Sequence, residues 1–296
     1  MHPLPLEYPQ SFRYRGVPTY FYHLSSAFFM VLFHRSSALV IAIGTMLSGC
    51  ATVYAPSVPH TPVLERGQVE LSAGMGRMSG VEAKAAWSPL PHLLLTGELS
   101  AIPNDAESSS TNTQGATTSD NQQQASIGIG YYHAPTAASP VYQAVVGGMG
   151  WGQRSFSSFE GFVSSPYIPI PLPTSSALYE TRYRRYYGQW YLAYPLSKKG
   201  LLGGLSFRSV WLDYSRLTYG GYPIQGNSSV FLEPSFFLRC GKGWLRYYAA
   251  GGVSLPVGSI STDQMGKQLG AVSYMLGGGI IFRPDLFLHR KKQVSL

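Results

Sequence analysis

Apolar and polar residues alternate with a period of two along most of the chain after residue 67. In the first such segment, Val69, Leu71, Ala73 and Met75 fall on one face, and polar or small residues fall on the other. This period is typical of a β-strand and argues against a helix. The pattern returns about ten times and predicts strands over residues 68–76, 81–87, 93–100, 125–132, 141–152, 177–194, 201–214, 229–240, 245–255 and 271–283.

The connections between these segments are alternately short and long. Short turns are expected at residues 88–91, 133–140, 195–200 and 241–243, and long polar or Pro-rich loops at 102–124, 155–176, 216–228 and 256–270, with the tight link 77–80 as the exception. Outer-membrane barrels combine an even strand number with short periplasmic turns and longer outer loops. The predicted fold is therefore all-β: an antiparallel up-and-down transmembrane β-barrel of about ten strands over residues 67–284, with a C-terminal tail at 285–296.

A short apolar run, Ala38 to Leu47, precedes the strands and is too short for a spanning helix. Arg35 comes before the run and small residues follow it, which is the order of a processed export signal. Residues 1–49 are therefore expected to be a leader. A start at Met30 would give it a short basic beginning, while an unusually long N-terminal region before the apolar run is the alternative. Residues 50–66 are predicted to form a tether.

The sequence Leu47-Ser48-Gly49-Cys50 resembles the lipobox of bacterial lipoproteins. The resemblance implies that the leader is cut before Cys50 and that this cysteine is acylated, which makes it the lipid-attachment residue. A buried cysteine at the end of an ordinary hydrophobic segment is the alternative. Residues 51–54 contain no acidic residue. By the same resemblance, this implies the bacterial outer membrane, with the lipidated N-terminus on its periplasmic face.

The segment Phe231 to Arg239 before a glycine turn, taken with the lipobox and the tether, resembles uncharacterised outer-membrane β-barrel lipoproteins of Bacteroidetes. The resemblance implies a monomer among outer-membrane lipid and lipopolysaccharide. The barrel-assembly and lipoprotein-sorting machineries are its implied partners. The tail after Pro284 departs from the terminal aromatic strand of many such barrels.

Composition supports strands over helices, since 296 residues include 33 glycines and 21 tyrosines and only 12% are charged. Loss of residues 1–49 removes three arginines and one glutamate, so 22 basic and 14 acidic residues become 19 and 13. These charges are dispersed, which favours a solvated or phosphate-facing surface over nucleic-acid binding. Aromatic residues near strand ends predict interfacial girdles, with a sugar-binding platform as the alternative. They are Trp87, Tyr131, Tyr132, Trp151, Tyr183 to Tyr187, Trp190, Tyr194, Trp211, Tyr214 and Tyr247.

The same alternation places charged residues inside the barrel. The candidates for luminal ion pairs are Glu70, Glu82, Lys84, Glu98, Arg208, Glu233, Arg239, Arg246 and Arg283, with Gln143 as a polar neighbour. The acids lie on early strands and the arginines on late strands, so closure would bring them together. Because a barrel of this size has little more room than its own side chains fill, we expect ion pairs to close the lumen.

Residues that could carry chemistry are few. The histidines after Cys50 are His60, His92, His133 and His289, which fall in the tether, in two predicted turns and in the tail. No enzyme activity, metal or cofactor is therefore expected. Cys240 would be alone once Cys50 is acylated, and it lies on an apolar strand face.

These features predict a structural or surface-binding role, with the polar outer loops as the contact surface. A narrow passive channel is the first alternative. A periplasmic β-sandwich lipoprotein, held only by its acyl chains, is the second.

Overall fold

The computed structural model describes residues 53–102, 120–136, 139–159, 162–165, 168–173, 176–197, 200–224, 228–257 and 272–287. The chain divides into two units, Met1–Gly49 and Cys50–Leu296, and the second contains every element described below. The predicted leader, Cys50, and most of the predicted loops 102–124 and 256–270 lie outside the described residues.

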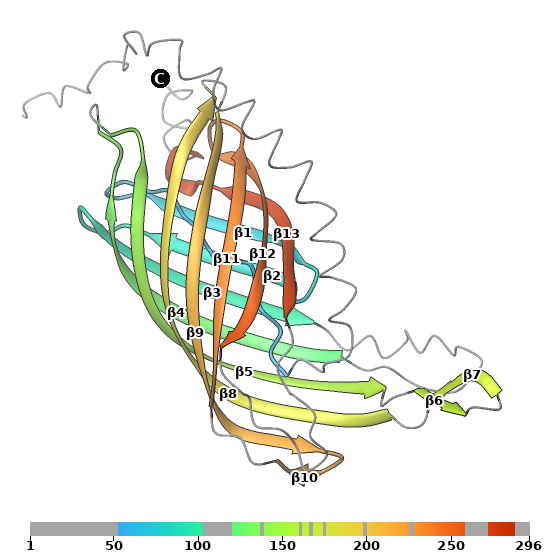
Figure 1. The fold of residues 1–296 in the computed structure, drawn as a ribbon. Coiled ribbons are helices and arrows are strands. Elements are labelled where there is room, and N and C mark those ends of the chain that lie inside the picture. The colour runs from blue at the N-terminus through green and yellow to red at the C-terminus, as the bar shows by residue number, and fades with distance from the viewer. Residues whose placement is uncertain are drawn as a thin grey trace, which may run out of the picture. The chain divides into compact units, whose positions relative to one another are not determined.

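Ten strands form one closed antiparallel barrel, shown in Figure 1. They are β1 (Val69–Gly76), β2 (Gly80–Trp87), β3 (Leu93–Ile102), β4 (Asp120–His133), β5 (Tyr142–Phe159), β8 (Ser176–Ser197), β9 (Leu201–Tyr219), β11 (Ser228–Cys240), β12 (Leu245–Val257) and β13 (Ser273–Phe282). Each pairs with the next along the chain, and β1 pairs with β13. The predicted ten-stranded barrel is confirmed. Closure leaves the sheet without the free edges of a β-sandwich, so that alternative is wrong.

The two ends of the barrel differ. At the turn end, short connections join β2 to β3, β4 to β5, β8 to β9 and β11 to β12. At the loop end, β8 and β9 reach 22 and 19 residues, whereas β1 and β2 have 8 each. The short strands β6 (Phe162–Ser165), β7 (Ile168–Pro173) and β10 (Tyr222–Pro223) also belong to this end. The predicted loop 155–176 is partly strand, because the β5–β8 ladder continues to Phe159.

Glycines with positive φ make the tight turns possible. At the turn end these are Gly200 (φ 93°), Gly241 (φ 113°) and Gly243 (φ 84°). A residue with a Cβ rarely adopts this left-handed backbone. Glycine therefore allows the tight connections between β8 and β9 and between β11 and β12.

The wall of the barrel has an apolar outer face and an inner face that carries the buried charged and polar side chains together with apolar ones such as Val210 and Leu212. Ile127, Leu205 and Phe236 are more than half exposed on the outside. More than half of the predicted aromatic girdle is on this face: Trp87, Tyr131, Trp151, Trp190, Tyr194, Trp211 and Tyr247 are exposed. The girdle prediction is wrong for Tyr132, Tyr183, Tyr187 and Tyr214, which are buried inside. Adjacent residues on a strand point to opposite faces, so a run of tyrosines cannot all face outward.

The chain after β13 begins with a helical turn at residues 284–287. Phe287 packs against Trp244 and Phe282, with ring centroids 5.5 and 5.9 Å away. Residues 284–287 therefore pack beside the β11–β12 turn, and the rest of the predicted tail lies outside the described residues.

Candidate functional site

The interior of the barrel is occupied by residues 53–64, which we call the luminal segment. The sequence predicted a tether here, but the structure places these residues inside the barrel. Val53 and Leu64 are fully buried, and Tyr54 is only 1% exposed. The inner wall includes small residues such as Ser100, Ser126 and Ser206 among its large side chains.

The luminal segment runs from the loop end to the turn end. Its first part lies near the loop ends of β4 and β11, where Tyr54 packs on Phe231 with ring centroids 4.9 Å apart. Its last part lies near the turn ends of β5 and β8, where Pro62 O accepts a 2.6 Å hydrogen bond from Tyr191. An extended segment of this length spans up to roughly 36 Å. This exceeds the apolar band of a transmembrane barrel, which is about 25 Å tall.

Prolines occur at every third position of this segment, Pro56, Pro59 and Pro62. Proline has no backbone N–H, and extended Pro-rich chain makes no internal hydrogen bonds. Its remaining backbone groups therefore need partners when buried. The barrel wall supplies them for much of the segment.

These partners come from seven strands, β2, β3, β4, β5, β8, β9 and β11. Carbonyl oxygens accept as follows: Ala55 from Gln122 Nε2 (3.2 Å) and Gln124 Nε2 (2.9 Å), Ser57 from Arg208 Nη2 (2.5 Å), Val58 from Lys84 Nζ (2.7 Å), His60 from Gln189 Nε2 (2.8 Å) and Thr61 from Arg239 Nη1 (3.1 Å). Backbone N–H groups donate from Val58 to Glu82 Oε1 (3.3 Å), from His60 to Glu98 Oε1 (3.1 Å) and from Leu64 to Tyr142 Oη (3.5 Å). The luminal segment is thus bound by main-chain recognition around most of the barrel.

Arg208 on β9 is the centre of the first ionic cluster. It is fully buried, and its Nε lies 2.6 Å from Glu233 Oε2 on the neighbouring β11. Its Nη1 lies 3.3 Å from Glu98 Oε2 on β3, and Arg185 Nη2 lies 3.7 Å from the same oxygen. One guanidinium therefore joins two strands of the wall and, through Ser57 O, the luminal segment.

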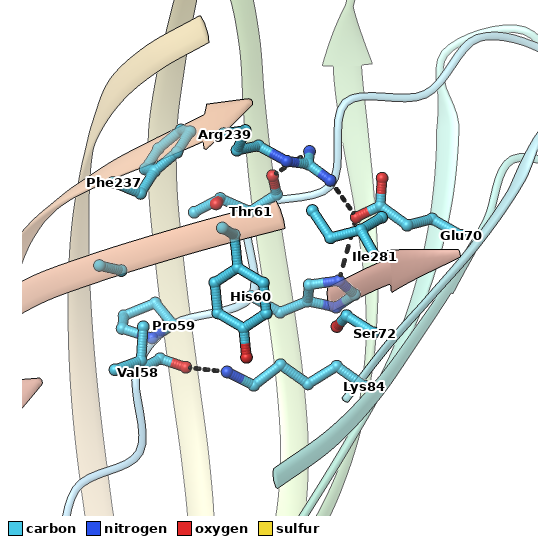
Figure 2. A pocket seen from close by; sticks show the side chains of 12 residues that line it. Val58, Pro59, His60, Thr61, Glu70, Ser72, Lys84, Phe237, Arg239 and Ile281 are labelled. Atoms are coloured by element: carbon cyan, nitrogen blue, oxygen red, sulfur yellow. Dashed lines mark hydrogen bonds and ion pairs between the residues drawn. The ribbon is translucent and has the colours of Figure 1, made fainter. Parts of the chain in front are cut away.

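Figure 2 shows a second cluster nearer the turn end. Arg239 Nη2 on β11 lies 2.5 Å from Glu70 Oε1 on β1, and His60 Nε2 lies 3.6 Å from that oxygen. Lys84 Nζ lies 2.5 Å from Glu82 Oε2 and also donates to Val58 O. Early acids and late arginines thus face one another inside the barrel.

The remaining candidates occupy other positions. Arg246 is half-buried and donates to Gly243 O (3.2 Å), and Arg283 pairs with Asp285 (2.9 Å); both lie at the turn end rather than in the clusters. Burial alone would raise the pKa of Asp285, but hydrogen bonds from Arg283 and its positive charge lower that pKa below its usual value. Gln143, expected inside, is exposed on the outer face.

The sequence did not lead us to expect two features of the lumen, the inward-facing Arg185 and the luminal segment. Arg185 is 2% exposed and faces inward, although it is not among the residues predicted to form luminal ion pairs. Its position between Tyr183 and Tyr187, with period two, is the signal that could have placed it inside. The three-residue spacing of the prolines was the available signal for an extended luminal segment.

A small cavity remains beside the second cluster. Its volume is about 20 Å³, and its lining includes His60, Glu70, Lys84, Arg239 and Tyr248. Such a volume holds about one water molecule. The luminal segment and the side chains around it therefore fill this part of the interior.

Cys240 is exposed on the outer face, next to the exposed Leu238, and His92 and His133 lie at the turn end as the sequence predicted. His60 instead lies in the lumen. Among the described residues, His, Cys, Asp and Glu side chains form no group of three suited to a metal ion. Within that same part of the chain, no helix has the length and apolar character needed to cross a membrane.

Comparison with known proteins gives no assignment: no family model, no curated protein and no solved structure matches this chain.

Proposed function

We propose that this protein is an outer-membrane β-barrel lipoprotein with a closed lumen and a structural or surface-binding role. The observation that carries the proposal is the combination of a closed barrel, an apolar outer face and an interior filled by residues 53–64.

The apolar outer face supports a lipid environment. Large exposed hydrophobic side chains occur on all ten strands, from Leu71 on β1 to Ile280 on β13. Soluble monomers rarely expose contiguous apolar patches larger than a few hundred Å². Burial of such a band in hydrocarbon explains why the polar and charged residues are gathered inside.

The filled lumen supports a closed rather than a conducting state. Arg208 pairs directly with Glu98 and Glu233 inside the barrel and also donates to Ser57 O of the luminal segment. A solute would have to displace this segment together with its hydrogen bonds. The channel alternative therefore requires the segment to leave the lumen.

The loop end supports a contact role. The long strands β5, β8 and β9 extend the wall there, and β6, β7 and β10 add to the same end. In outer-membrane barrels the longer loops face outward, so this end would meet lipopolysaccharide and any external partner. An acylated Cys50 would add an anchor worth about 0.8 kcal/mol per buried CH2.

The test is electrophoresis of the purified mature protein in detergent, boiled and unboiled, with fractionation of the expressing cells. A closed barrel in the outer membrane predicts a heat-dependent shift in migration and recovery with outer-membrane vesicles. Recovery in the soluble fraction after Cys50→Ala would contradict the membrane-spanning role, since acyl chains would then be the sole attachment.

A further inference from the structure

The luminal segment rises above the barrel wall at its shortest side. β1 and β2 are joined at the loop end by the turn 77–79, and Glu82 lies just beyond that turn, where its carboxylate accepts from Ser79 Oγ. The same carboxylate accepts the backbone N–H of Val58. Val58 is therefore close to the level of this turn.

Residues 53–57 continue toward the loop end, beside the longer strands. Ala55 O accepts from Gln122, two residues from the start of β4, and Tyr54 packs on Tyr183 with ring centroids 6.0 Å apart. The chain is held here by β4, β8 and β11, whereas β1 and β2 end lower. The direction of the segment is thus fixed at several independent contacts.

We propose that the mature N-terminus leaves the barrel at the loop end, so that acyl chains on Cys50 insert into the outer leaflet of the membrane, at the cell surface. Three residue steps separate Cys50 from Val53 and span at most about 11 Å. This distance is too short for Cys50 to reach the turn end, because the whole luminal segment is needed to span the barrel. The inference rests on the proposed function, and it reverses the expectation of a lipid on the periplasmic face.

The short side of the wall gives the acyl chains a route to the bilayer. β1 and β2 end at the 77–79 turn, so the rim of the barrel is lower there than on the side of β8 and β9. The closed wall also means that the segment cannot enter sideways after folding.

The experiment places a short epitope between Thr52 and Val53 of the full chain, leaving the luminal segment unchanged. Matched controls carry the same epitope between Gly220 and Gly221, at the loop end, or after Pro135, at the turn end. Antibody binding is measured on intact cells and after permeabilisation of the outer membrane. Heat-dependent migration identifies the variants that retain the barrel.

We expect the N-terminal and Gly220 epitopes to bind antibody on intact cells, and the Pro135 epitope to bind only after permeabilisation. A hidden N-terminal epitope beside an exposed Gly220 epitope overturns the inference and leaves the proposed function standing. Antibody binding to the Pro135 epitope on intact cells would mean that the turn end faces outward. It would overturn both the proposed orientation of the barrel and the surface location of the N-terminus. If all three are hidden and the protein is soluble, the proposed function itself fails.

A point substitution gives a second measurement if the insertion prevents folding. Thr52→Cys in a Cys240→Ala background is treated on intact cells with a membrane-impermeant maleimide. Labelling before permeabilisation is the expected result, and labelling only after it contradicts the inference.

Discussion

At the scale of single residues, the stability of the barrel depends on acidic and basic side chains that are buried in the lumen in equal number. The luminal clusters contain Glu70, Glu82, Glu98 and Glu233 against Lys84, Arg185, Arg208 and Arg239, all buried. Removing one partner of a buried pair leaves the other charge uncompensated, which costs about 3–5 kcal/mol. Arg208 and Arg239 also donate to backbone carbonyls of the luminal segment, so these two guanidinium groups contact both the wall and the segment.

Arg208→Met tests this dependence. It leaves Glu98 and Glu233 buried without their shared partner, so we expect the free energy of unfolding to fall by about 3 kcal/mol. The measurement is the urea midpoint followed by tryptophan fluorescence in detergent micelles. Arg184→Met is the matched control, because Arg184 is exposed on the outer face of the neighbouring β8 and should change stability by less than about 0.5 kcal/mol. Equal losses in both variants would contradict the central role of Arg208.

Gly241→Ala tests the turn geometry. A Cβ at this position would meet Arg246 Cα at 3.1 Å, on a backbone with φ of 113°. We expect a loss of about 1–3 kcal/mol in the same urea measurement. Gly147→Ala is the control, since its Cβ would meet nothing within 4 Å, and no loss is expected there. An unchanged midpoint for Gly241→Ala would show that the turn does not require glycine.

At the scale of elements, the strands and the luminal segment were predictable to different degrees. Period-two alternation predicted all ten barrel strands, because one face had to be apolar and the other polar. The loop-end extensions of β5 to Phe159 and of β9 to Tyr219 were missed, since their pairing with β8 continues where the apolar face becomes mixed. The position of residues 53–64 was missed for another reason. Their backbone is hydrogen-bonded by side chains of the wall, so their own side chains need not alternate between apolar and polar. Only the spacing of Pro56, Pro59 and Pro62 indicated an extended chain.

Deletion of residues 53–62, with Cys50 and its two following residues retained, tests what the luminal segment does. The lumen would then be lined by charged side chains without the chain that fills it. We expect the full-length protein to be electrically silent in planar lipid bilayers and the deletion variant to conduct. The variant must still show heat-dependent migration, which verifies the barrel. A folded deletion variant that stays silent would mean that the side chains alone close the lumen, as the sequence predicted.

At the scale of the whole molecule, alternation, turn lengths and strand number predicted the architecture, but the sequence could not show where the N-terminal segment goes. The pairing of early acids with late arginines followed from closure, as in Arg239 with Glu70. The position of Arg246 and Arg283 at the turn end did not follow, because alternation gives the face of a strand and not the depth along the barrel. Depth also decides which outer positions meet the centre of a bilayer.

Ile127→Arg tests the apolar band. Ile127 is 68% exposed and lies midway along β4. An arginine near the bilayer midplane costs a transmembrane barrel about 2–4 kcal/mol, and about 0–1 kcal/mol near an interface. Val257→Arg, at the loop end of β12, is the matched control. Stability measured by urea titration in phosphatidylcholine vesicles should fall in the first variant and hardly change in the second; equal changes would argue against a lipid-facing band.

The most direct measurement of the central claim is a photo-crosslink from the luminal segment to the wall. Tyr54 is replaced by benzoylphenylalanine in the full chain, and the folded protein is irradiated, digested and analysed by mass spectrometry. Because Tyr54 packs on Phe231 and Tyr183, the crosslinked peptides should come from β11 and β8 near the loop end. Crosslinks only to the short turns, or none to the barrel wall, would contradict a threaded lumen and restore the external tether.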